Sequence, residues 1–262
     1  MQSSIVMSRS PSAVLLILAV VISIGCTRRS IGVGESLPGS GEHQHRGGLV
    51  RTTRAQTDIA RAALLVETTP LPRTQKQSLL SGINAEAGAI RTQLRKESSA
   101  GEIMAALNAH FFGPEGFAAV NDLTAPENVS VSAVLDHRRG TCVGLAIVYL
   151  ALAQRLGLDA HAVATPVHLF VRVKLDGRAR NVELLEGGRE IDDDTYRRRY
   201  RIDEASIAAG VFIRDLTNAE VIAHLLSNQA VALSKEGKLD EALVRYDAAL
   251  ELAPQLVAAW YN

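Results

Sequence analysis

Three residues of this chain have the side chains of a thiol-based catalytic site. Cys142 opens an apolar run, His168 begins an alternating segment, and Glu183 lies on the segment that follows it. A thiolate can attack a carbonyl carbon, an imidazole can move the proton, and a carboxylate can fix the tautomer of that imidazole. The sequence therefore predicts that Cys142 is a nucleophile, that His168 is its base, and that Glu183 orients the base.

The element that would carry Cys142 is a buried helix. Gly140 interrupts the preceding segment, Thr141 is a suitable N-cap, and Gly157 suits the C-cap position. Residues 142–153 are apolar almost without interruption, which is typical of a helix buried on all sides. A cysteine in the first turn meets free backbone N–H groups and the positive end of the helix dipole, which favour thiolate. The alternative is that Cys142 is simply a small core residue.

A hairpin would bring His168 and Glu183 together. Residues 160–165 form a short candidate strand, residues 167–175 alternate strictly, and Asp176-Gly177 is a strong two-residue turn before a return strand over 178–185. If Leu175 pairs with Arg178, then His168 and Glu183 are diagonal neighbours on one face, roughly 7 Å apart at Cβ. A glutamate side chain can reach an imidazole across that gap.

Other polar residues are weaker candidates. His137 precedes the helix break, so its position is not predictable, and His161 at a strand start is expected to be structural. Asp192, Asp193 and Asp194 could supply an acid or a cation site, but they fit a turn and helix start better. The basic run 197–199 is expected to be a solvated helix face.

Helices are expected to precede the site. Apolar spacing predicts helices over 57–67, over 73–96, over 100–112 with Ser99 as N-cap, and another after Pro126. Together with the hairpin they predict an α+β fold in which the Cys142 helix packs against an antiparallel sheet.

The N-terminus has the pattern of an export signal. Arg9 precedes an apolar run over 13–24, which is too short to span a membrane comfortably, and Gly25-Cys26 follows. This ending resembles a bacterial lipoprotein processing site, in which Cys26 is acylated and anchors the protein to a membrane. Ser23 and Ile24 depart from the usual pattern, and plain secretion and an uncleaved anchor remain alternatives.

Residues 27–56 are expected to be a flexible linker. The first part is rich in Gly, Ser, Arg and His and poor in apolar residues. Glu42, His43 and His45 are interpreted as part of this polar tract and not as a metal site.

Composition narrows the function classes. Lys+Arg and Asp+Glu are both 28, so the net charge of zero gives no reason to expect nucleic-acid binding. Aromatic residues are 4% with a single Trp, which argues against a base- or sugar-stacking platform. Two cysteines do not make a disulfide framework.

The C-terminal segment 223–262 resembles one tetratricopeptide repeat and the start of a second. The residues at the expected spacing are Ala230, Gly237, Ala242, Tyr246, Ala249, Leu250 and Pro254. Such repeats bury their faces against neighbours, so we expect either further repeats or docking on the preceding domain. The repeat implies a protein partner.

The string from Glu127 to Val173, with RRGTCVGLAIVYLALAQRLGL and ATPVHLFVRV, resembles the transglutaminase-like superfamily and its SirB-type bacterial branch. The resemblance implies a papain-like core over 128–215 behind a helical subdomain over 57–127, with Cys142, His168 and Glu183 as the catalytic residues and no cofactor or metal. The usual third residue of the family is Asp, where this chain has Glu183. The signal would occupy 1–26.

Two function classes follow. The first is an exported thiol-dependent amide hydrolase or acyl transferase that acts on a peptide or protein. The second is a catalytically inactive protein-binding scaffold at the cell envelope.

Overall fold

The computed structural model describes residues 58–262 of the chain. The Cys26 site, the signal over 1–26 and the linker that holds His43 and His45 lie outside the described residues. Within 58–262, no helix combines the length and the apolar composition needed to cross a bilayer. The elements in chain order are α2 Ile59–Leu65, α3 Arg73–Thr92, α4 Ala100–Phe111, β1 Ala118–Ala119, η1 Pro126–Val129, α5 Val131–His137, β2 Arg139–Gly140, α6 Cys142–Leu156, β3 Asp159–Ala164, β4 Leu169–Leu175, β5 Arg178–Val182, α7 Asp193–Tyr200, α8 Glu204–Ala208, α9 Asn218–Lys235, α10 Leu239–Leu252 and α11 Val257–Tyr261.

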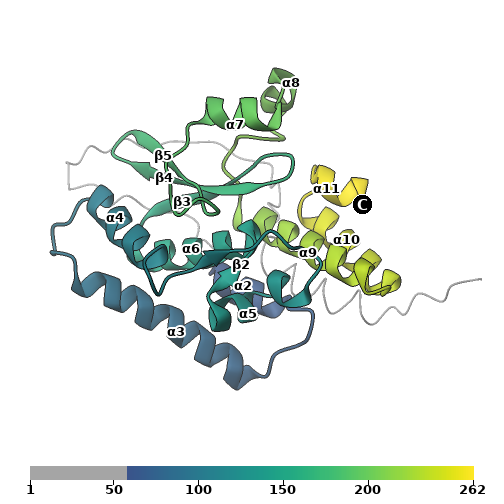
Figure 1. Ribbon diagram of the computed structural model, residues 1–262, viewed down its shortest axis with the longest axis horizontal. Helices are drawn as coiled ribbons and strands as arrows, with labels where there is room; N and C mark the ends of the chain where they lie inside the picture. Colours follow the sequence, from purple (N-terminus) through teal and green to yellow (C-terminus); the bar gives the residue numbers. More distant parts are fainter. Residues whose placement is uncertain (1–57) are drawn as a thin grey trace, which may run out of the picture.

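The described chain is layered around α6 and one small sheet. Figure 1 shows α6 at the centre, the sheet β3-β4-β5 on one side of it with α7 beyond, and α3 on the other side. Alternate residues of β4 serve the two sheet faces: Leu169, Val171 and Val173 join the main core that contains α6, whereas Phe170 packs with Tyr196 of α7. Mixed helices and strands in this arrangement fit the predicted α+β class.

The strand register agrees with the hairpin prediction. β4 and β5 are antiparallel, Leu175 pairs with Arg178, and Arg172 pairs with Asn181. Asp176 and Gly177 have φ of 39° and 83°, which is the left-handed backbone that a two-residue hairpin turn requires. The return strand was expected to reach Leu185, but β5 ends at Val182.

The shorter β5 has a local cause. The backbone N–H of Glu183 donates to the Arg189 carbonyl, and the N–H of Gly188 donates to the Glu183 carbonyl. The chain therefore turns back on itself after Val182 instead of continuing beside β4. Glu183 sits at the base of this loop.

Helix ends largely follow the sequence signals. Ser99 caps α4 in a capping box with Glu102, and Gly157 ends α6 in the left-handed conformation. Thr141 was expected to cap α6, but its hydroxyl makes no cap hydrogen bond and is buried without a partner in the described part of the chain. The helix predicted over 73–96 ends at Thr92.

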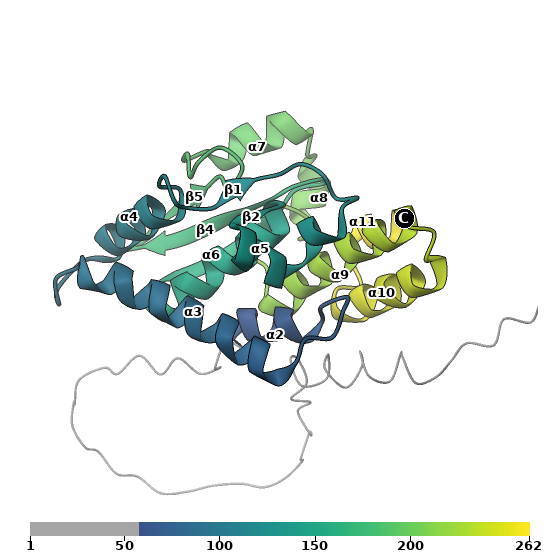
Figure 2. The ribbon, with the colours of Figure 1, turned by 60° about the horizontal axis from the view of Figure 1, so that its bottom comes forward.

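The C-terminal helices continue the same body. α9 and α10 lie side by side as a hairpin in Figures 1 and 2, joined through Gly237 at φ 78°. The buried Arg245 of α10 donates to the carbonyls of Val66 and Glu67 and to Gln229 of α9. The hairpin is thus fastened to the end of α2, and its buried side chains belong to the same apolar cluster as α6. Its assignment to the tetratricopeptide repeats stays a prediction.

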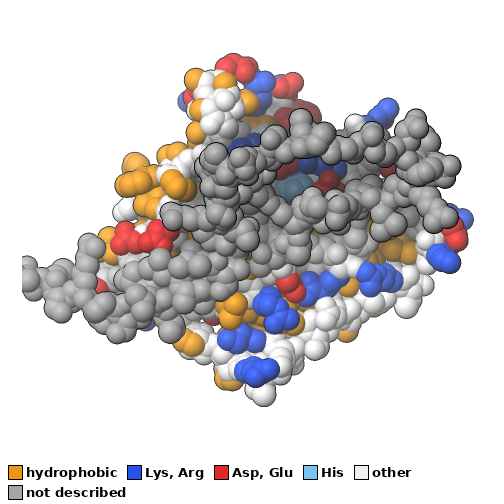
Figure 3. Space-filling model, turned by 180° about the vertical axis from the view of Figure 1, so that it is seen from behind, with side chains coloured by type: hydrophobic (Ala, Val, Ile, Leu, Met, Phe, Trp, Pro, Cys, Tyr) orange, Lys and Arg blue, Asp and Glu red, His pale blue; other side chains and the backbone are white. Residues whose placement is uncertain are grey.

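Charged side chains are mixed on the surface. On the part of the face in Figure 3 that is not grey, acidic and hydrophobic side chains lie among the basic ones. This distribution is consistent with the zero net charge of the sequence.

Candidate active site

Cys142 is the first residue of α6, so its side chain lies at the end of the helix where backbone N–H groups are free. It is a half-buried free thiol, whereas the residues from Val143 to Ala153 that follow it are fully buried.

Gly140, two residues before Cys142, permits the close approach of α5, because an added Cβ would lie 2.7 Å from Val134 Cγ2. The buried body of α6 therefore fixes the position of a thiol that remains accessible.

His168 is held by the turn between β3 and β4. The Thr165 N–H and hydroxyl both donate to the His168 carbonyl, at 2.8 and 3.0 Å. Thr165 is itself buried, so this contact is shielded from water. The turn places the imidazole immediately before β4, with its side chain only 4% exposed.

Glu183 contacts His168 directly. His168 Nε2 donates to Glu183 Oε2 at 2.8 Å, and the Tyr196 hydroxyl donates to the same oxygen at 2.7 Å. The other oxygen, Oε1, accepts from the Leu185 N–H at 2.9 Å. The carboxylate side chain is 1% exposed, so every strong interaction it makes is with protein.

The electrostatics favour an ionised pair at His168 and Glu183. Burial by itself lowers the pKa of His168, but hydrogen bonds with Cys142 and Glu183 outweigh burial and raise this pKa to about 9. Burial by itself raises the pKa of Glu183, but the contacts with His168, Leu185 and Tyr196 bring it below its usual value. His168 therefore contacts Glu183 through Nε2, and it lines the same cavity as Cys142.

Two tyrosines of α7 complete the surroundings of the imidazole, and the sequence reasoning missed both. Tyr196 stacks on Phe170 with ring centroids 4.0 Å apart, and Tyr200 lies 6.0 Å from the His168 ring. Burial and the Glu183 hydrogen bond raise the pKa of Tyr196, so its hydroxyl stays protonated and donates. A usable signal was present: these are the two aromatic residues, spaced i and i+4, on an otherwise charged short helix.

A buried arginine anchors α7 to the sheet. Arg172 of β4 donates to Asp193 at the start of α7 at 2.6 Å, to Asp215 at 3.1 Å and to Asn181 of β5 at 3.1 Å. Asn181 also donates to Asp193, at 2.7 Å. This network holds the helix that supplies Tyr196.

The weaker candidates lie in structural positions. Asp192 caps α7 by accepting from the Thr195 N–H at 2.7 Å, and Asp193 belongs to the Arg172 network. His161 pairs with Asp159 at 2.7 Å near the start of β3. His137 is an exposed residue at the end of α5.

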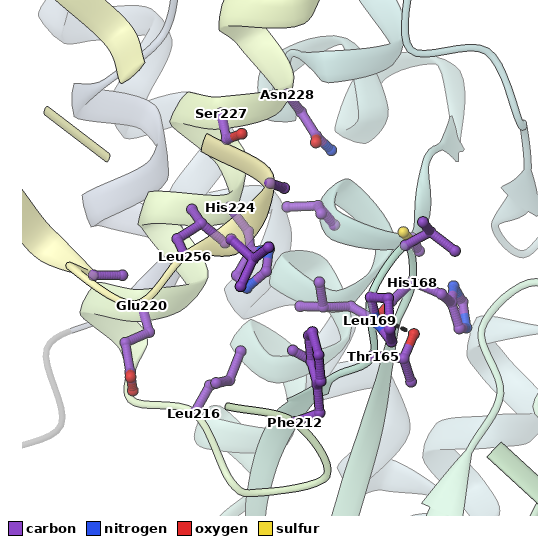
Figure 4. Close-up of a pocket in the computed structure, with 18 of the residues that line it drawn as sticks. Thr165, His168, Leu169, Phe212, Leu216, Glu220, His224, Ser227, Asn228 and Leu256 are labelled. Atoms are coloured by element: carbon purple, nitrogen blue, oxygen red, sulfur yellow. Dashed lines mark hydrogen bonds between the residues drawn. The ribbon is translucent and has the colours of Figure 1, made fainter. Parts of the chain in front are cut away.

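A cavity of about 210 Å³ opens beside Cys142 and His168. Its far wall is α9, and Figure 4 shows Glu220, His224, Ser227 and Asn228 of that helix across the pocket from Thr165 and His168. Apolar side chains of the chain before α9 and of the α10–α11 region complete the walls. The arrangement places a thiol and an imidazole at the edge of a pocket, with a carboxylate behind the imidazole.

Comparisons with known proteins place these residues in a family context. The profile of the transglutaminase-like superfamily matches residues 77–227, which includes the whole site and the first half of α9. The chain is also similar to UPF0162 proteins of two Xylella fastidiosa strains, 9a5c and Temecula1, at 26% identity over 159 residues, covering 58% of this chain and 56% of each relative. The chain thus spans about half the length of the curated relatives it matches.

Among solved structures, the chain resembles the crystal structure of menin that reveals the binding site for the Mixed Lineage Leukemia protein. The sequence identity is 17%, the TM-score is 0.36, and the match covers 76% of this chain and 58% of that one. A likeness at this level carries no structural argument.

Proposed function

This chain belongs to the transglutaminase-like superfamily, and from that premise we propose that it is a thiol-dependent amide hydrolase or acyl transferase acting on a peptide or protein. The observation that carries the proposal is the buried imidazole of His168, which is hydrogen-bonded to the fully buried Glu183 carboxylate and lines the same cavity as the accessible Cys142 thiol. A packing cysteine has no need of a hydrogen-bonded imidazole whose charged form is stabilised by a second acid.

The chemistry follows from these three groups. The Cys142 thiolate attacks the amide carbonyl carbon, and the C–N bond breaks as the protonated His168 gives its proton to the leaving nitrogen. The acyl group is then held as a thioester on Cys142. Water or an amine attacks the thioester carbonyl, His168 takes a proton from it, and the acyl product leaves as the C–S bond breaks. Glu183 keeps Nε2 protonated and stabilises the imidazolium throughout.

The backbone supports the first step. Cys142 is at the N-terminus of a helix of 15 residues, where free N–H groups and the helix dipole stabilise negative charge. The same groups are suited to an oxyanion formed on the carbonyl under attack.

Labelling with iodoacetamide tests the proposal without knowledge of the substrate. In the purified full-length chain at pH 7, Cys142 is expected to react at least about tenfold faster than free cysteine in the same solution, because the proposed mechanism uses a thiolate that protonated His168 stabilises. Peptide mapping by mass spectrometry identifies the labelled residue. His168→Ala should abolish the advantage, while His161→Ala, which removes a histidine outside the site, should leave it unchanged. Equal labelling of the wild type and His168→Ala at the rate of free cysteine would refute the proposal.

A second candidate function is protein binding by an inactive domain, and exposed apolar side chains at the C-terminal helices favour it. Val257 and Trp260 of α11 are 52% and 68% exposed, and Leu239 and Leu243 of α10 are 61% and 56% exposed. We infer that a protein partner would bind there through the tetratricopeptide-like hairpin, in either functional class. Unreactive Cys142 together with partner binding lost in Trp260→Ala would favour the scaffold.

We also propose that the protein is exported and lipid-anchored at Cys26, on the periplasmic side of the cell envelope. The support is the short apolar run that ends in Gly25-Cys26. Mass spectrometry of the mature N-terminus tests this proposal: cleavage before Cys26 with attached lipid is expected, and an intact Met1 contradicts it.

A further inference from the structure

One face of α9 lines the cavity with polar side chains. Glu220, His224, Ser227 and Asn228 are spaced at i, i+4, i+7 and i+8, which places them on one side of the helix, and all four lie along the cavity wall. Figure 4 shows them opposite the His168 side of the pocket. This face of α9 is defined by these four residues.

The charged residues of the cavity wall neutralise each other. Both Glu220 oxygens accept from the Arg214 guanidinium, and they also accept from the Thr217 N–H and from Gln255. Arg214 donates in addition to the Gly210 and Asp215 carbonyls. Neither charge is therefore free to compensate a charge on a ligand.

The remaining three residues of this face are free to bind. Within residues 58–262, the side chains of His224, Ser227 and Asn228 have no hydrogen-bond partner. Burial lowers the pKa of His224 to about 4, with a small opposing effect of Glu220, so the ring is neutral and offers one donor and one acceptor. The three groups together present an uncharged set of donors and acceptors to the cavity.

We propose that His224, Ser227 and Asn228 select acyl substrates whose side chain ends in an uncharged hydrogen-bonding group. The stem of that side chain would pack on Leu216, Val231 and Leu256, which line the same cavity. A carboxylate or an ammonium in this place would be desolvated with no free counter-charge, and an apolar end would leave the three polar groups unpaired. The inference deepens the proposed function and rests on it, because the selected group must sit beside a reactive Cys142.

Three acyl probes of nearly the same shape test the selection. N-acetyl chloromethyl ketones of asparagine, aspartate and leucine differ only in whether the side chain ends in an amide, a carboxylate or methyl groups. In the wild-type full-length chain the asparagine probe should label Cys142 at least about tenfold faster than either of the others, the ratio expected when one or two hydrogen bonds distinguish ligands. Chloroacetamide, which has no side chain, reports the intrinsic reactivity of Cys142.

Variants of α9 assign the preference to residues. His224→Phe and Asn228→Leu should each reduce the asparagine advantage, and the double variant should label fastest with the leucine probe, when each rate is expressed relative to chloroacetamide labelling of the same variant. Ser234→Ala, on the same helix but outside the cavity wall, is the matched control and should keep the wild-type order. Circular dichroism melting confirms that each variant is folded, and Ser227→Ala offers a milder change if the double variant is not.

The outcomes separate the two proposals. Equal labelling by the three probes, or a preference for aspartate or leucine in the wild type, overturns the selection and leaves thiol catalysis standing if chloroacetamide labelling still depends on His168. A Cys142 that reacts with chloroacetamide no faster than free cysteine removes thiol catalysis, and the selection with it.

Discussion

Replacing Glu183 by glutamine removes the negative charge beside His168 and keeps the shape of the side chain. Oε2 accepts from both His168 and Tyr196, whereas Oε1 accepts from the Leu185 N–H. The glutamine oxygen can take the place of Oε2 and keep both side-chain contacts. The new NH₂ group then faces the Leu185 N–H, so one hydrogen bond is lost and two donors oppose each other. The volume is unchanged, and we expect the fold to persist.

The magnitude follows from the charge that is lost. A hydrogen bond to a charged group is worth about 1.5 to 3 kcal/mol, compared with about 1 kcal/mol for a neutral one. Losing the charge of Glu183 therefore costs the imidazolium about 0.5 to 2 kcal/mol, which corresponds to a factor of about 2 to 30 in its population relative to neutral imidazole. The pKa of His168 should move down from about 9 toward its ordinary value of 6.5. The ratio of imidazolium to neutral imidazole at pH 7 is about 100 in wild type and falls to between about 3 and 50, so the imidazolium still predominates at pH 7 and is depleted mainly near pH 9.

The assay is iodoacetamide labelling of Cys142 as a function of pH. For Glu183→Gln, the rate should change by less than about twofold at pH 7 and should fall about 2- to 15-fold relative to wild type near pH 9, the wild-type pKa of His168, before the difference disappears at still higher pH, where the thiolate forms without the imidazolium. Asp192→Asn is the control, because Asp192 only caps α7. Full reactivity in Glu183→Gln together with loss in Asp192→Asn would show that the acid lies after the loop and that the assignment of Glu183 is wrong.

Three further outcomes are expected. Tyr196→Phe keeps the stack on Phe170 but removes the donor to Glu183, so labelling of Cys142 should slow about threefold to tenfold, and urea unfolding should show a loss of about 1 kcal/mol. Arg245→Met leaves the buried carbonyls just after α2 and the Gln229 oxygen of α9 without this donor, and it should lower the free energy of unfolding by about 3 kcal/mol. Because the pKa of His168 is raised from 6.5 to about 9, its contribution to stability is full below pH 6.5 and is lost as pH rises through 9, so wild type should lose more stability than His168→Gln between pH 6 and 10.

Each of these outcomes has a control and a contrary result. Lys235→Met, at the exposed end of α9, should change stability by less than about 0.5 kcal/mol, and an equally small effect in Arg245→Met would show that the guanidinium does not hold the hairpin. Unchanged labelling of Cys142 in Tyr196→Phe would show that the Tyr196 hydroxyl does not contribute to the reactivity of Cys142. Parallel pH profiles of wild type and His168→Gln would contradict the raised pKa.

The repeat patterns of short sequence segments predicted the parts of the site whose positions depend on residues close to them in the chain. The strict alternation over β4 and the Asp176-Gly177 turn fixed the register, and the register alone placed Glu183 near His168. The apolar run of α6, with Gly157 after it, predicted the helix that begins at Cys142. These features depend on backbone geometry that short stretches of sequence specify.

The parts that could not be predicted depend on contacts between distant segments. Tyr196 reaches Glu183 because α7 is held to the sheet by Arg172 and Asp193, two residues 21 positions apart. No repeat pattern in the sequence indicates that these two residues are in contact. The basic run after Tyr196 instead suggests that the whole helix is exposed to solvent. The shape of the cavity depends on contacts between segments that are even farther apart, because α9 lies far along the chain from the strands that carry His168.

α9 lines the cavity and also packs in the C-terminal hairpin, and this limits how the chain can be divided or recombined. One side of this helix closes the cavity beside Cys142, and another side packs on α10. A division of the chain near residue 215, between the predicted core and the predicted repeat, would carry the thiol away from one wall of its own pocket. The hairpin is therefore not an independent module, since grafting it from a relative would replace one wall of the cavity, and with it the proposed ligand preference, together with the proposed partner surface.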